Sequence, residues 1–287
     1  MYQAFGTQKR LTSKRKKLIK NIDNIINSYR DAGMKITVRQ VYYQCVSKNL
    51  IPNNANQYNK IVDLVADGRL HGLIDWAAIE DRTRYTRENA HWDSPEEIIQ
   101  NALEAYKIDT RKTQPVYLEA WIEKDSLVSI LEDTCRRLDV PCFSCRGNPS
   151  ITALHEASYR FIEHQNQHCI ILYAGDHDPS GLNIPAVIQE RFYDFGVDVD
   201  LRRIGITLAQ IKELELPPFP AKITDGNYKK YVMTTGLKDS WELDALPPET
   251  LSELFRKNIL ELTDLDLWRK ELDRQKQDKT RLAEMLA

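Results

Sequence analysis

Residues 169–181 read CIILYAGDHDPSG, an apolar run followed at once by acids, a proline and a glycine. A short apolar run bounded by turn residues is typical of a strand buried in a parallel sheet. Asp176 and Asp178 follow this strand directly. Because ligands bind outside the carboxyl ends of the strands of an open α/β sheet, both acids are candidates for a site at that edge.

Strand and helix patterns alternate around this stretch. We expect strands at 116–122, 140–145, 169–174 and 197–204 and helices at 125–138, 150–164, 181–194, 247–263 and 264–285. Such alternation indicates βαβ crossovers and a parallel sheet covered on both faces, an α/β Rossmann-like fold.

A third acid, Glu123, follows the strand at 116–122 and reaches the same edge. Alternate side chains of an extended segment point the same way, which brings Asp176 and Asp178 together. Three carboxylates without a Cys or His ligand favour Mg²⁺ or Mn²⁺ over zinc. The alternative is that the two aspartates only cap a helix beginning at Gly181.

The net charge of -2 hides an uneven division along the chain. Residues 1–113 carry 19 Lys/Arg against 13 Asp/Glu, and the remainder carries 21 against 29. The N-terminal part therefore suits a polyanion. With no apolar run of membrane-spanning length and no apolar block behind the basic N-terminus, we expect a soluble, cytoplasmic protein with no membrane contact.

Helical spacing predicts three helices in this N-terminal part. The first ends at Gly33, the second opens at Thr37 with a Thr37–Gln40 capping box, and the third spans 54–67 with Gly68 as its C-cap. In the third helix we expect Tyr58, Ile61, Val62 and Val65 on the inner face. With a hairpin from residues 73–76 and 79–84, residues 12–88 suit a winged helix-turn-helix; a small helical interaction domain is the alternative.

Helical geometry separates the neighbouring tyrosines of the second helix. Tyr42 falls on the apolar stripe, whereas Tyr43 lies off it, beside Arg39 at i-4. An exposed tyrosine next to an arginine suits attack on a phosphodiester. An ordinary surface or DNA-contacting tyrosine is the alternative.

A helix at 94–107 precedes the polar segment 109–115, where we place a domain boundary. The expected divisions are a basic arm and helix, a winged-helix DNA-binding domain, a metal-binding α/β domain and C-terminal helices: 1–34, 35–110, 115–246 and 247–287.

Three motifs resemble the topoisomerase VI A subunits and the related meiotic double-strand-break enzymes. The segments 122–124 (IEK), 146–150 (RGNPS) and 175–181 (GDHDPSG) are similar to their Toprim domain. The segment 37–43 (TVRQVYY) resembles the R-x-x-Y-Y of their winged helix. The segment 241–246 (WELDAL) resembles their K-x-E-I-x-A-L stretch without its lysine.

This resemblance implies Mg²⁺ ligation by Glu123, Asp176 and Asp178, and attack by Tyr43 on DNA to leave a 5′-phosphotyrosyl link. Glu123 could also act as a general acid or base. The family works as a homodimer in which the tyrosine of one subunit faces the metal of the other. With no G-x-x-x-x-G-K-[ST] motif, ATP chemistry would need a separate ATPase subunit.

Two further functions stay open. One is a Toprim nuclease that uses metal-activated water, in a mobile-element or defence setting. The other is a DNA-binding protein without catalytic activity.

Overall fold

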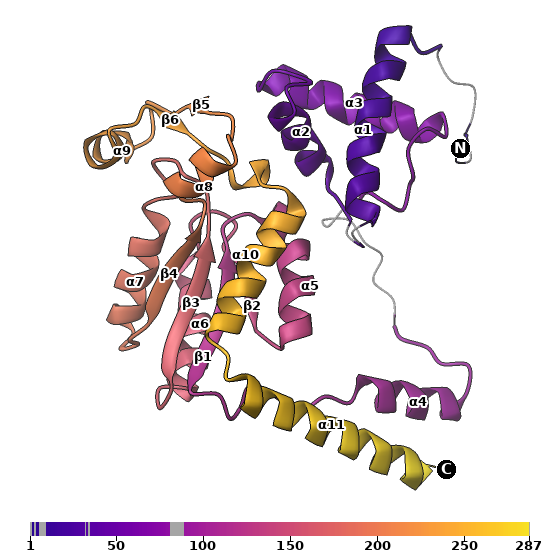
Figure 1. Ribbon diagram of the computed structural model, residues 1–287, viewed down its shortest axis with the longest axis vertical. Helices are drawn as coiled ribbons and strands as arrows, with labels where there is room; N and C mark the ends of the chain where they lie inside the picture. The colour runs from indigo at the N-terminus through magenta and orange to yellow at the C-terminus, as the bar shows by residue number, and fades with distance from the viewer. Residues whose placement is uncertain are drawn as a thin grey trace.

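The computed structural model describes residues 2, 4–5, 10–31, 33, 35–80 and 89–286. Figure 1 shows a group of N-terminal helices beside a larger α/β part, with two helices projecting from the latter.

The N-terminal group contains α1 (Ser13–Asp31), α2 (Val38–Ser47) and α3 (Ala55–Leu70). Their apolar faces meet in one core. The capping box at Thr37 is confirmed. Two expectations for α3 are wrong: Gly68 lies inside the helix, and Tyr58 and Val62 are exposed. Leu64 takes the inner position instead, since α1 packs against that side.

A hairpin after α3 is not seen among the described residues. Residues 73–80 contribute one parallel bridge, between Ile36 and Ile79. Residues 81–84 of the expected hairpin lie outside the described part of the chain. In its described residues the N-terminal part is thus a three-helix unit with a single strand-like bridge.

The α/β part is built on a four-stranded parallel sheet with the order β2-β1-β3-β4. Its strands are β1 (Val116–Ile122), β2 (Cys142–Ser144), β3 (His168–Ala174) and β4 (Asp200–Gly205). The expected α/β class and parallel sheet are confirmed. β1 and β3 are paired along their whole length, and Ile122 lies opposite Ala174 at the carboxyl end.

Helices cover both faces of this sheet (Figure 1). One face packs against α5 (Val128–Leu138) and α10 (Pro248–Glu261). The other packs against α6 (Ile151–Glu163) and α7 (Ile184–Asp194). Alternate residues of each strand enter the two cores, as expected for a sheet buried on both sides.

Smaller elements follow β4 along the upper edge of the sheet in Figure 1. They are α8 (Leu208–Glu213), β5 (Phe219–Pro220), α9 (Tyr228–Thr235), β6 (Asp239–Ser240) and the 3₁₀ turn η2 (Leu243–Ala245); a similar turn, η1 (Asp125–Leu127), precedes α5. An antiparallel bridge between His177 and Trp241 ties the segment before η2 to the loop after β3.

The last helix, α11 (Leu265–Leu286), runs beside α4 (Pro95–Ala105) below the sheet. The polar segment 109–115 packs on the sheet part: Thr110 donates to Asp139, and Gln114 accepts from the Asp264 amide at 2.8 Å.

Candidate active site

Glu123 and Asp176 meet at the carboxyl edge of the sheet because β1 and β3 are neighbours that end in register. The Glu123 amide donates to Ala174 O at 2.9 Å. The Asp176 amide donates to Glu123 Oε2 at 2.8 Å. Two of the three expected acids are therefore in direct contact.

The third acid, Asp178, shares a small space with Glu123. Its Oδ1 accepts the Gly181 N–H at 2.6 Å, so Asp178 caps this turn, although α7 itself begins at Ile184 and not at Gly181 as expected. A methyl group added to Gly181 would lie 3.0 Å from both Asp178 Oδ1 and Glu123 Oε2. The glycine leaves room where these carboxylate oxygens face each other.

Asp176 is turned toward the segment 241–246. Its Oδ1 accepts the Leu243 N–H at 2.7 Å, and its Oδ2 lies 3.0 Å from Lys124 Nζ. Lys124 Nζ also lies 2.7 Å from Asp244 Oδ2 and contacts Glu242. One ammonium group therefore joins three carboxylates.

We call the five carboxylates at this edge the acidic cluster: Glu123, Asp176, Asp178, Glu242 and Asp244. Burial raises the pKa of Glu123, and it raises the pKa of Asp176 well above its usual range. Burial alone would lower the pKa of Lys124, but Asp176, Asp244 and Glu242 outweigh it and raise this pKa. Lys124 is therefore protonated.

Cationic side chains accompany the acidic cluster. Three cations interact with the five carboxylates: Lys124, Arg39 and Arg203. A divalent cation at this edge would favour the ionised forms of the carboxyl groups whose pKa burial raises. The donors are carboxylate oxygens, which Mg²⁺ and Mn²⁺ prefer.

A three-ligand metal group is nevertheless not preformed among the described residues. Glu123 Oε2 and Asp178 Oδ1 both lie beside Gly181, and each accepts a backbone N–H bond. The Asp176 carboxylate is engaged by Lys124 and Leu243. The carboxylates fit a hard cation in the type of their donor atoms, while Asp176 is paired with Lys124.

The structure brings Tyr43 and Arg39 to the same cluster. Lys124 Nζ lies 5.2 Å from the centre of the Tyr43 ring, and an Arg39 guanidinium nitrogen lies 3.4 Å from Tyr43 Oη. The expected exposure of Tyr43 is wrong: it is half-buried, because its ring packs on Tyr42 and the N-terminal core. Burial, reinforced by Glu242, raises the pKa of Tyr43 to about 12, although Lys124 and Arg39 oppose this.

Sequence reasoning missed Lys124, Glu242, Asp244 and Arg203 as members of this site. Arg203, on β4, donates to the carbonyl oxygens of Gly175 at 2.7 Å and Asp176 at 2.6 Å, and so shapes the acidic loop. Glu242 and Asp244 lie in the 241–246 segment, which the resemblance singled out but to which it gave no role.

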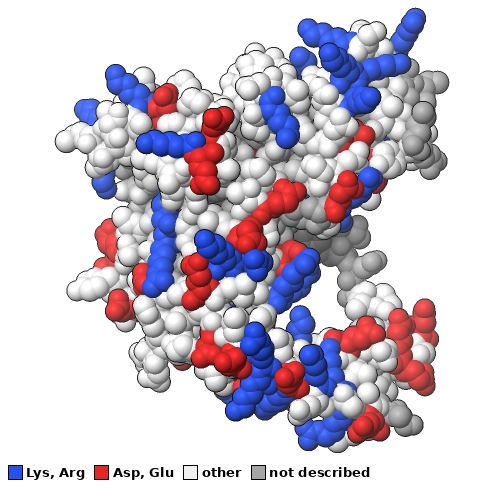
Figure 2. Space-filling model, in the orientation of Figure 1, with Lys and Arg blue, Asp and Glu red and all other residues white. Residues whose placement is uncertain are grey.

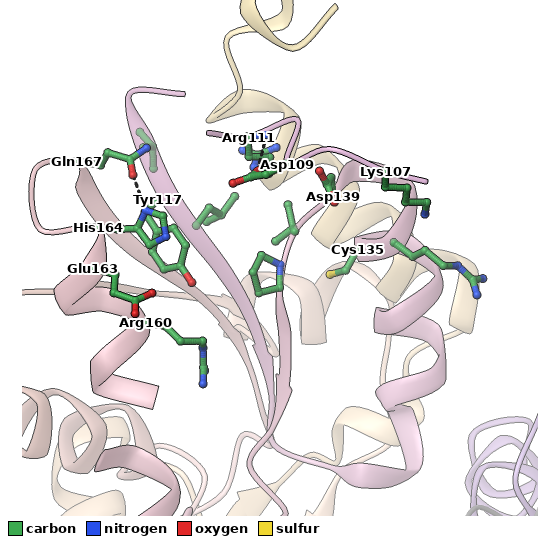
Figure 3. A pocket seen from close by; sticks show the side chains of 15 residues that line it. Lys107, Asp109, Arg111, Tyr117, Cys135, Asp139, Arg160, Glu163, His164 and Gln167 are labelled. Carbon is green, nitrogen blue, oxygen red and sulfur yellow. Dashed lines mark hydrogen bonds between the residues drawn. The ribbon is translucent and has the colours of Figure 1, made fainter. Parts of the chain in front are cut away.

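A separate pocket of about 480 Å³ lies at the amino end of β1 (Figure 3). Its charged side chains are largely paired within the protein. Arg160 donates to both oxygens of the buried Glu119 at 2.7 and 2.9 Å, and Thr110 donates to Asp139. This pocket is at the opposite end of the sheet from the acidic cluster.

None of the helices in the described part of the chain combines the length and apolar character needed to cross a bilayer. No family model matches the chain, and no curated protein matches its sequence.

Proposed function

We propose that this protein is a Mg²⁺-dependent enzyme that cuts DNA by tyrosine transesterification, as the resemblance to topoisomerase VI A subunits implies. In this proposal α1–α3 form the winged-helix-like unit and the parallel sheet is the Toprim-like domain. Tyr43 is the nucleophile, Arg39 assists it, and Glu123, Asp176 and Asp178 hold the metal.

One observation carries the proposal: within a single chain, α2 places Tyr43 against Lys124, which pairs with the acidic cluster, and Arg39 against Tyr43. The interface is reinforced by Gln44, whose amide donates to Leu246 O at 3.3 Å. A phenol, a guanidinium group and clustered carboxylates are the components that phosphodiester transesterification requires.

The proposed reaction replaces one ester bond to phosphorus by another. Tyr43 Oη loses its proton and forms a bond to phosphorus, the bond from phosphorus to O3′ breaks, and O3′ takes up one proton, so that bonds and protons balance. Arg39 stabilises the phenolate and the phosphate charge. The raised pKa of Glu123 suits a carboxyl group that exchanges a proton with the sugar oxygen. Bound Mg²⁺ would supply Lewis-acid stabilisation of the phosphate.

A basic surface suited to DNA lies on the N-terminal unit. Figure 2 shows Lys and Arg gathered over the first turns of α1, where Lys14, Lys16, Lys17 and Lys20 are exposed. Phosphate contacts of this kind make binding fall steeply with salt. On α3, by contrast, Arg69 is held by the carbonyl oxygens of Trp76 and Ile79.

The test is plasmid cleavage with Mg²⁺ or Mn²⁺, stopped with denaturant to trap covalent adducts. Wild-type protein is expected to give a protein–DNA adduct, and Tyr43→Phe is expected to give none. Tyr42→Phe is the matched control: the same atom is removed one position away, and adduct formation should persist. Asp178→Asn should abolish cutting while DNA binding survives. Cutting that is unaffected by Tyr43→Phe would rule out transesterification by Tyr43.

A nuclease that uses activated water is the second candidate. It is favoured by the half-buried position of Tyr43 and its pKa of about 12, which hold the phenol protonated. This enzyme would keep cutting in Tyr43→Phe, leave no covalent adduct, and lose activity in Asp178→Asn. A protein that binds DNA but shows neither cutting nor divalent-ion binding would be the non-catalytic alternative.

The resemblance implies a homodimer in which the tyrosine of one subunit serves the metal site of the other. Mixing two inactive variants tests this arrangement. Tyr43 lies beside Lys124 of its own chain, so a mixture of Tyr43→Phe and Asp178→Asn is expected to stay inactive. Recovery of cutting in the mixture would instead show that the tyrosine works in the partner's site. A separate ATPase subunit stays part of the proposal and would be tested by adding candidate ATPases with ATP.

A further inference from the structure

The ammonium group of Lys124 forms ion pairs with carboxylates of the acidic cluster. Its side chain is 11% exposed, and its ammonium group contacts Asp176, Glu242 and Asp244. The Asp244 side chain is fully buried. A buried carboxylate needs a counter-ion, and within this cluster Lys124 supplies it for three carboxylates at once.

The contact between Lys124 and Asp176 places an ammonium group where a metal ion bound to Asp176 Oδ2 would lie. Asp176 has two carboxylate oxygens: Oδ1 accepts the Leu243 amide, and Oδ2 faces Lys124 Nζ at 3.0 Å. A divalent ion that takes Asp176 Oδ2 as a ligand must replace the ammonium group there, because two cations held at the same carboxylate oxygen repel each other.

We propose that Lys124 is an internal cation that competes with a divalent metal ion for Asp176, so that metal binding requires Lys124 to leave this carboxylate. The inference rests on the metal-binding part of the proposed function. Glu242 and Asp244 are the carboxylates that keep Lys124 nearby when it leaves Asp176. Lys124 also faces the Tyr43 ring. Replacement of Lys124 by the metal ion at Asp176 therefore alters the charge beside the proposed nucleophile.

Calorimetric titration with Mn²⁺ tests the competition. Lys124→Met removes the ammonium group and is expected to bind Mn²⁺ about tenfold more tightly than wild type, an ordinary size for such coupling. Lys124→Arg keeps the charge and should bind like wild type. Lys257→Met, on the exposed face of α10, lowers the net charge equally and should change the affinity by less than about twofold.

A second measurement uses the wild-type chain, because Lys124→Met leaves Asp244 buried without its counter-ion. Reductive methylation followed by mass spectrometry reports how freely each lysine reacts. Methylation of Lys124 is expected to be slow without Mn²⁺ and at least about fivefold faster with it, while Lys257 is unchanged.

Equal or weaker Mn²⁺ affinity in Lys124→Met, an unchanged methylation rate, or no Mn²⁺ binding to either protein overturns the inference. The two proposals fail separately. A protein that cuts DNA but whose Mn²⁺ affinity does not depend on Lys124 refutes the competition alone. One that shows the exchange but cuts no DNA refutes the proposed function alone.

Discussion

At the scale of single residues, Tyr42 and Tyr43 show how one helical position changes a side chain's surroundings. Tyr42 is buried in the N-terminal core, and its hydroxyl bonds to Asn53 and Asn54. Tyr43, one hundred degrees round the helix, faces Arg39 and Lys124. Only Tyr43 can therefore serve the acidic cluster.

Cleavage by Tyr43 should depend on pH. A phenol with a pKa of about 12 is protonated at neutral pH, and its phenolate becomes about tenfold more abundant with each pH unit below that value. Single-turnover cleavage with Mg²⁺ should therefore rise about tenfold per unit from about pH 7 to about pH 9. DNA affinity at each pH is the control. A flat profile would point to water or to a general base.

The space around Gly181 is too small for a side chain beside the carboxylates. A Cβ there would lie 2.4 Å from Asp176 O, so the loop must shift. We expect Gly181→Ala to lower the free energy of unfolding by about 1–3 kcal/mol, measured by urea denaturation. Gly226→Ala is the control, since nothing lies within 4 Å of its added Cβ. Equal stability of the two variants would contradict the crowding.

The sequence could place some residues of the site at the sheet edge but not others. Glu123 and Asp176 could be placed because each follows a recognisable strand and parallel strands end at one edge. Glu242 and Asp244 could not, because the bridge from His177 to Trp241 that brings them to this edge joins residues with no shared periodicity. Lys124 was visible beside Glu123, but its ion pairs depend on that same bridge.

At the scale of elements, periodicity located the four strands of the sheet and the helices α5, α6, α7, α10 and α11, but it located none of α8, β5, α9 and β6. Side-chain contacts set the ends of the elements that were located. β2 covers only residues 142–144 of the expected 140–145, and α7 begins at Ile184 because Asp178 and Gly181 form a turn first. α2 matches closely, since its Thr37–Gln40 capping box is a local signal that needs no tertiary contact.

Thr37 is expected to stabilise α2 measurably. Its hydroxyl accepts the Gln40 amide at 3.2 Å, and the Gln40 side chain accepts the Thr37 amide at 2.7 Å. Thr37→Ala should cost about 1 kcal/mol in urea denaturation. Thr37→Ser keeps the accepting oxygen and should cost clearly less. If both variants lose the same stability, the cap is not the cause.

At the scale of the whole molecule, the α4–α11 pair projects from the body (Figure 1). No residue of α4 is buried. Polar contacts join the region to α11: Lys279 donates to Glu104 O at 2.9 Å, and Tyr106 donates to Asp278 at 3.1 Å. The sheet, by contrast, is buried on both faces. Stability should therefore differ strongly across the chain.

Hydrogen exchange should show this difference directly. The amides of α4 should exchange orders of magnitude faster than those of β1 and β3, because α4 can unfold without opening a core. Mass spectrometry of peptides from 95–105 and 168–174 provides the comparison. Protection of α4 equal to that of β3 would show that something else covers this helix.

The contact of α2 with the acidic cluster has a further consequence, because both partners belong to one polypeptide. A covalent connection raises the effective concentration of one surface for the other above that of two separate chains. The Gln44–Leu246 and Tyr43–Lys124 contacts can therefore be individually weak and still be formed most of the time. A contact between tethered units can also open without either unit unfolding, and the proposed cleavage requires such an opening if a DNA duplex is to reach Tyr43.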